Sequence, residues 1–92
     1  MIHTANVALA PAEVLALAKR YFAERLPNTA AFVEQEGPQF LGLRGQGGEE
    51  IVINATLLDG GLTRVRASTL FFDQAMDRFF STLPLTGVVE VA

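Results

Sequence analysis

The clearest pattern in the chain is a helical repeat of apolar side chains over residues 11–26. Leu15, Ala18 and Phe22 recur at steps of three and four, which places them on one face of a helix. A proline opens the segment, where a helix does not need the missing N–H, and Pro27 follows its end. The pattern therefore predicts an amphipathic helix with one buried face.

Most of the remaining chain consists of short apolar runs separated by turn residues, which is typical of strands. Glycine tolerates positive φ, so the glycine-rich segment 45–48 and Asp59-Gly60-Gly61 predict hairpin turns. Strands joined by such tight turns pair antiparallel. We therefore expect an N-terminal strand and an antiparallel meander, with strands at residues 2–9, 30–35, 39–44, 49–58 and 62–71.

A second helical repeat covers residues 74–83, with Met76 and Phe79 among its apolar positions. Asp73 is the expected N-cap, because its short side chain can accept hydrogen bonds from the first unpaired N–H groups of a helix. Pro84 is expected to end the helix.

These elements predict one two-layer α+β domain over residues 1–92. We expect an antiparallel sheet of about five strands with two helices on one face, in the order β-α-β-β-β-β-α. Residues 85–92 fit either a last edge strand or a loose tail.

Strand alternation divides the sheet into a buried face and an open face. The face beneath the helices is expected to hold Leu41, Leu43, Ile51, Ile53, Ala55, Leu57, Val65, Ala67, Thr69 and Phe71. The candidate binding residues of the open face are Arg44, Arg64, Arg66, Asn54 and Phe40.

Two interpretations of the three arginines remain. Guanidinium groups on neighbouring strands could bind a carboxylate or a phosphate. Alternatively, they could form cross-strand ion pairs with Glu34, Glu36 and Glu50, which lie on adjoining strands. The closeness of these acids along the chain favours the ion pairs.

The amino-acid composition argues against several classes of protein. Hydrophobic residues make up 50% of the chain and charged residues 18%, which excludes intrinsic disorder. The longest strictly apolar run, residues 14–18, is far shorter than the roughly 20 residues of a membrane-spanning helix. The formal net charge of −3 argues against nucleic-acid binding, which needs a positive field.

Few side chains could carry out catalysis. The chain has no cysteine and one histidine, which excludes thiol nucleophiles, disulfides and a two-histidine metal site. We interpret His3 as an incidental surface residue near the chain end, and Asp77 as part of a solvated helix face. We therefore expect no enzyme activity, no metal and no cofactor.

The order of elements resembles one half of the TATA-binding-protein fold and a shortened START-type (SRPBCC) helix-grip fold. Residues 6–16 (NVALAPAEVLA) and the closing helix 73–83 carry the second resemblance, because a strand leads through Pro-Ala-Glu into a helix. The helix-grip resemblance implies a carrier of apolar ligands. The other resemblance implies nucleic-acid binding through the open sheet face.

The apolar excess favours a different function, a non-catalytic cytoplasmic protein that self-associates as a homodimer through sheet edges or exposed phenylalanines. We expect one member of each pair, Phe71-Phe72 and Phe79-Phe80, to face the core and the other to face away. A small START-like carrier and a binder of anions or nucleic acid are the alternatives. The six arginines against one lysine are typical of GC-rich bacterial genomes.

Overall fold

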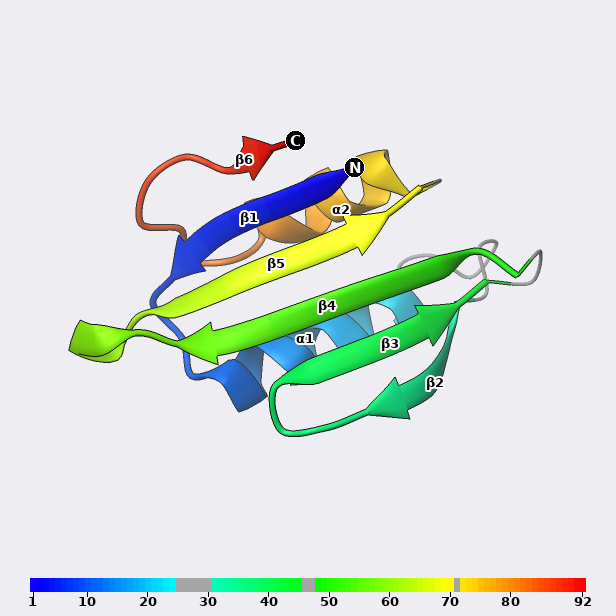
Figure 1. The fold of residues 1–92 in the computed structure, drawn as a ribbon, viewed down its shortest axis with the longest axis horizontal. Helices are drawn as coiled ribbons and strands as arrows, with labels where there is room; N and C mark the ends of the chain where they lie inside the picture. The colour runs from blue at the N-terminus through cyan, green and yellow to red at the C-terminus, as the bar shows by residue number, and fades with distance from the viewer. Residues whose placement is uncertain (25–30, 46–47, 71) are drawn as a thin grey trace.

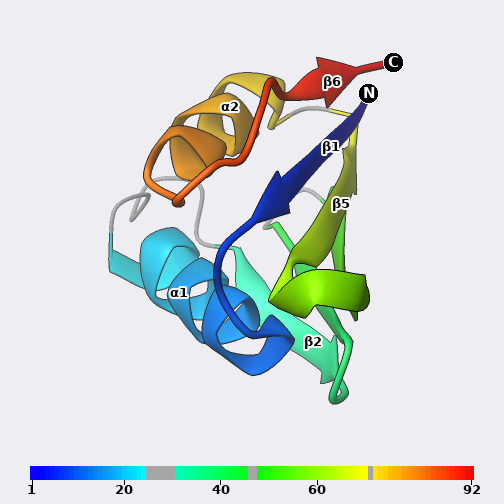
Figure 2. The same cartoon turned by 90° about the vertical axis from the view of Figure 1, so that its left-hand side faces the viewer.

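The computed structural model describes residues 1–24, 31–45, 48–70 and 72–92, which form one antiparallel sheet and two helices. Figure 1 shows the sheet face-on, and Figure 2 shows both helices on the same side of it. The expected two-layer α+β fold is confirmed. In chain order the elements are β1 (Ile2–Val7), α1 (Pro11–Glu24), β2 (Phe32–Glu36), β3 (Phe40–Arg44), β4 (Glu50–Leu57), the 3₁₀ turn η1 (Asp59–Gly61), β5 (Thr63–Thr69), α2 (Asp73–Ser81) and β6 (Glu90–Val91).

The sheet has six strands in the order β2-β3-β4-β5-β1-β6, and all neighbours are antiparallel. Strands β2 to β5 form the expected meander, and β1 pairs with the remaining side of β5. After α2 the chain returns along β1, with a bridge between Val7 and Leu85 and then the short strand β6. Residues 85–92 therefore contain an edge strand, which raises the number of strands from about five to six.

Helix α1 buries the face that its apolar repeat predicts. Val14, Leu15, Ala18 and Phe22 are each at most 7% exposed. The helix begins at Pro11, as expected. Its expected end at residue 26, and the expected start of the next strand at residue 30, lie outside the described residues.

Helix α2 packs against α1 and β1 and buries two adjacent phenylalanines. Phe79 and Phe80 are 1% and 0% exposed, so the expectation that one of them faces away was wrong. The ring of Phe79 lies 6.1 Å from that of Phe22 on α1, whereas the ring of Phe80 lies 6.0 Å from that of His3 on β1. Adjacent helical residues point roughly 100° apart, so contacts on two sides bury both.

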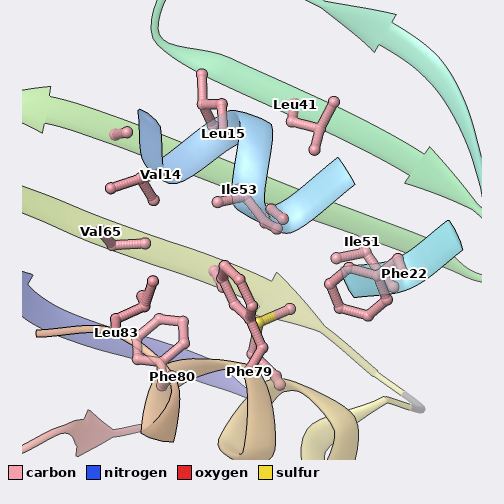
Figure 3. Packing of buried hydrophobic residues seen from close by; sticks show 14 of the residues in the cluster. Val14, Leu15, Phe22, Leu41, Ile51, Ile53, Val65, Phe79, Phe80 and Leu83 are labelled. Atoms are coloured by element: carbon pink, nitrogen blue, oxygen red, sulfur yellow. The ribbon is translucent and has the colours of Figure 1, made fainter. Parts of the chain in front are cut away.

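The core lies between the sheet and the two helices (Figure 3). Nine of the ten side chains expected there are described, and eight of these nine are buried. Leu57 is the exception at 59% exposure, because the end of β4 extends beyond the helices (Figure 1). Phe71 lies outside the described residues.

The turn between β4 and β5 has the glycines that its backbone requires. Gly60 and Gly61 have φ values of 84° and 80°, in the left-handed region that other residues rarely adopt. The N–H of Leu58 donates to the carbonyl of Leu62 at 2.7 Å and closes the turn. The predicted hairpin is confirmed here, and β3 and β4 form the other predicted hairpin.

Candidate functional site

The candidate site is the sheet face that the helices leave uncovered. Strand alternation places a polar group at its centre, and all of its members are exposed: Asn54, Thr56, Arg64, Arg66 and Ser68. Asn54 pairs across the strands with Phe40 on one side and Arg66 on the other. The strand register therefore connects three of the five candidate binding residues, and Arg64 lies two residues from Arg66 on β5. The fifth is Arg44.

Arg44 lies apart from the other two arginines. It pairs with Glu50 at one end of β4, whereas Arg64 pairs with Thr56 near the other end. Its Nε donates to Glu34 Oε2 at 2.6 Å and its Nη1 donates to the carbonyl of Gly48 at 3.0 Å. The bond to Glu34 raises the pKa of Arg44, and the guanidinium is thus already engaged.

Arg64 and Arg66 are different, because neither guanidinium has an ion pair or hydrogen bond with the part of the chain that the structure describes. Both line an open groove of about 500 Å³ between the sheet face and the segment that follows α2. The other lining residues are Thr4, Ala5, Asn6, Thr86, Val88 and Glu90. The two arginines are thus available to a ligand.

Phe40 packs against its own hairpin. Its ring lies over Gly37, where an added Cβ would come within 2.4 Å of a ring carbon. The N–H of Gly37 donates to the carbonyl of Phe40 at 2.9 Å and fixes this turn. Phe40 remains 37% exposed at the margin of the open face.

Exposed apolar side chains lie at both outer edges of the sheet, and Leu57 and Leu70 are further ones at the ends of the inner strands β4 and β5. Phe32 and Val33 on the edge strand β2 are 55% and 40% exposed. At the opposite edge, Val88 and Val91 are at least 49% exposed. An apolar surface at an edge strand is a common place for association between chains.

The two edges differ in how their backbone is covered. The segment after α2 pairs with β1 through His3 and Val91, and the N–H of Thr86 donates to the carbonyl of Asn6 at 2.9 Å. Strand β2, in contrast, is exposed at all five residues, and no described strand pairs with its outer side. The sheet therefore ends on one side in β6, which has two residues, and on the other side in β2, which has five (Figure 1). A very short edge strand offers few groups for pairing, so β2 is the more open edge.

Both acidic residues of the open edge have cationic partners. Glu34 accepts from Arg44, and Glu36 Oε2 lies 2.8 Å from the Nζ of Lys19 on α1. A register shift between Val33 and Gln35 marks a bulge in β2. The ion pair of Glu34 fits the cross-strand interpretation of Arg44, whereas Glu36 pairs with a helix residue.

His3 is buried, which corrects its interpretation as a surface residue. It is 3% exposed, and its Nε2 donates to Asp73 Oδ1 at 3.0 Å. Strand β1 lies inside the sheet, so its alternate residues His3, Ala5 and Val7 all face the core. The same alternation is visible in the sequence and could have revealed the buried position of His3.

Asp73 is the first residue of α2, not its N-cap. The cap residue is Phe72, which makes no side-chain capping bond. The carboxylate of Asp73 instead accepts from His3 and lies 3.5 Å from the α-amino group of Met1. The hydrogen bond from His3 is the largest cause that lowers the pKa of Asp73.

The pair of His3 and Asp73 stabilises the fold and presents no histidine nitrogen to a substrate. The second ring nitrogen of His3, Nδ1, is buried and has no hydrogen-bond partner among the described residues. A general base needs a nitrogen within reach of the reacting proton, and a substrate cannot reach Nδ1 here. The described ranges also hold no group of three or more residues suited to a metal ion.

The space between α2 and the sheet is filled by large side chains. Met76, Phe79 and Phe80 are at most 1% exposed, and Figure 3 shows the two phenylalanine rings facing the strands.

No helix in the described part of the chain is long and apolar enough to cross a membrane. Comparison with models of protein families, with curated proteins and with solved structures found no match.

Proposed function

We propose that this chain is a non-catalytic cytoplasmic binding protein that forms a homodimer through the open edge of its sheet. The observation that carries the proposal is that β2 is exposed along all five of its residues, whereas the strand at the opposite edge, β6, has only two residues. An edge strand leaves a row of backbone N–H and C=O groups on its outer side, and a second copy of the same strand can pair with them. Antiparallel pairing of two β2 strands would join both sheets into one.

The side chains of β2 support a second copy as the partner. Phe32 and Val33 would bury apolar surface in the contact. Glu34 and Glu36 would approach their counterparts, and their ion pairs with Arg44 and Lys19 reduce the repulsion between them. A two-fold contact uses the same patch on both copies, so each β2 edge is consumed.

The test is sedimentation velocity of the natural chain and of variants at ~10–100 μM, a range that detects micromolar dimers. We expect a dimer for the natural chain and a monomer for Val33→Lys, because lysine on an edge strand opposes pairing. Leu57→Lys is the control, because Leu57 is similarly apolar and 59% exposed but lies on β4, inside the sheet. It should remain a dimer.

Circular dichroism shows whether the variant remains folded, and Val33→Lys should retain the spectrum and thermal midpoint of the natural chain. Phe32→Lys provides a second edge variant with the same expected result. A natural chain that sediments as a monomer would overturn the proposal. So would a dimer that survives both edge variants.

A carrier of apolar ligands is the weaker candidate. A START-type carrier would hold its ligand between the last helix and the sheet, where this chain packs Met76, Phe79 and Phe80. The edge of β2 needs no such cavity. Self-association is therefore the function that the described geometry supports best.

A further inference from the structure

We propose that the groove over β5 and β1 binds a small phosphate monoester through Arg64 and Arg66. This site lies apart from the proposed dimer contact, because β3 and β4 separate β5 from β2. The proposal therefore goes beyond the proposed function and does not depend on it. It also assigns a role to two of the five candidate residues and leaves Arg44 to its structural ion pair.

The two arginines of the groove favour a ligand with two negative charges. Arg64 and Arg66 are two residues apart on one strand, so their side chains point to the same face. Neither is neutralised by the described chain, and the acidic residue that lines the groove is Glu90. A phosphate monoester carries a charge of about −1.5 to −2 near neutral pH and offers three acceptor oxygens, which suits two guanidinium forks.

The side chains of Thr4 and Asn6 add uncharged hydrogen-bond donors to the groove. Thr4 and Asn6 pair across the strands with Arg66 and Arg64, and their side chains lie on the same face. Thr86 stands at the wall of the groove, held by hydrogen bonds of its N–H and hydroxyl to the carbonyl of Asn6 at 2.9 and 3.2 Å. This wall belongs to the segment that returns along β1, so the groove is formed by the fold itself.

The position of Glu90 indicates what the rest of the ligand carries. Thr4 pairs with Arg66 on one side and with Glu90 on the other, which places the two charged residues roughly 10 Å apart across the groove. A carboxylate there repels a phosphate but accepts hydrogen bonds from a hydroxyl. The ligand class is therefore a small phosphate ester with a hydroxyl group at its other end.

The experiment is an NMR titration of the isotope-labelled natural chain with inorganic phosphate and with glycerol phosphate, at constant ionic strength. Saturable shifts should cluster at Thr4, Asn6 and Thr86, and glycerol phosphate should bind more tightly than phosphate. Arg66→Gln should weaken binding about tenfold, since it removes a charged hydrogen-bonding group. Arg78→Gln, an exposed arginine of α2, is the matched control and should change nothing.

A second variant tests the orientation of the ligand. Glu90→Gln should tighten the binding of inorganic phosphate, because it removes a repulsive charge. It should also reduce the preference for glycerol phosphate. Loss of binding in Glu90→Gln, equal losses in Arg66→Gln and Arg78→Gln, or no saturation below ~10 mM would overturn the proposal.

Two further readouts separate this site from other functions. Arg66→Gln should leave the oligomeric state unchanged, and Val33→Lys should leave phosphate binding unchanged, so either proposal can fail alone. A single-stranded oligonucleotide that bound more tightly than glycerol phosphate, with an affinity falling steeply with salt, would indicate a nucleic-acid site and overturn the small-ligand assignment.

Discussion

At the scale of single residues, the contact between His3 and Asp73 joins the first strand to the start of the last helix. The two residues are 70 positions apart in the chain, and their side chains meet at 3.0 Å. Burial of a histidine ring is unfavourable unless its polar atoms find partners, and Asp73 satisfies one of its two nitrogens. The pair thus fixes where α2 begins against the sheet.

The lowered pKa of Asp73 predicts how this pair contributes to stability. A carboxyl whose pKa is lower in the folded chain than in the unfolded chain stabilises the fold above its unfolded pKa. That contribution is lost as the pH falls through the lowered pKa of the folded state. Asp73→Asn should therefore reduce the free energy of unfolding at neutral pH, and the difference from the natural chain should vanish in strong acid.

Denaturant unfolding at a series of pH values measures this difference. Asp77→Asn is the control, because Asp77 lies exposed on the same helix and loses the same charge. A deficit in Asp73→Asn that stayed constant at all pH values would show that the contact stabilises by packing or hydrogen bonding alone.

At the scale of elements, the hairpin β2–β3 forms the edge of the sheet and carries the charges that the proposed dimer contact needs. Arg44 Nε lies 2.6 Å from Glu34, and in a two-fold pairing of β2 strands both copies of Glu34 lie in one contact. Without Arg44, these like charges would face each other without neutralisation.

Arg44→Gln should therefore weaken the dimer about three- to tenfold in dissociation constant, the range expected when exposed ion pairs are removed from both copies. Sedimentation equilibrium at two salt concentrations checks this. High salt should reduce the difference in dissociation constant between Arg44→Gln and the natural chain, because it screens repulsion between exposed charges. Arg20→Gln, on the exposed side of α1, should have no such effect, and an equal loss there would contradict the prediction.

The elements themselves were largely predictable from local patterns. The repeat of Leu15, Ala18 and Phe22 requires only that one helix packs on one sheet. Alternation in β4 and β5 predicted the buried side chains of both strands except at Leu57. The contact of His3 with Asp73 and the fit of Phe80 against β1 depend on where β1 enters the sheet. No local pattern determines the pairing of strands so far apart along the chain.

The same limit applies to the open face. Sequence alternation placed all three arginines on one face, but it did not show that Arg44 lies at the opposite end from Arg64. Nor did it show that the segment after α2 returns to form a wall beside Arg64 and Arg66. These features depend on strand register and on the strand order of the complete sheet.

At the scale of the whole molecule, the segment after α2 determines how many edges the sheet leaves open. Its backbone covers β1 from the bridge between Val7 and Leu85 to the hydrogen bonds between Ile2 and Ala92 at 2.9 Å. With this segment in place, the edge opposite β2 is the two-residue strand β6, and a very short edge strand offers few groups for pairing. The five-residue strand β2 is therefore the edge that pairs with a second copy, and association through edges stops at a dimer. When both copies pair through the same edge, no such edge remains for a third copy. Chains with two edges that can pair, in contrast, can add further copies.

Removal of residues 86–92 should therefore change the type of assembly and not only its strength. The truncated chain keeps the buried Leu83 and the bridge at Leu85, but it exposes the edge of β1, so that the sheet has two open edges, β1 on one side and β2 on the other. We expect light scattering to show species larger than a dimer, which grow with protein concentration. Combining the truncation with Val33→Lys blocks one of the two edges and should limit growth to a dimer formed through β1. If the truncated chain stayed a dimer of unchanged affinity, the returning segment would not be what closes the assembly.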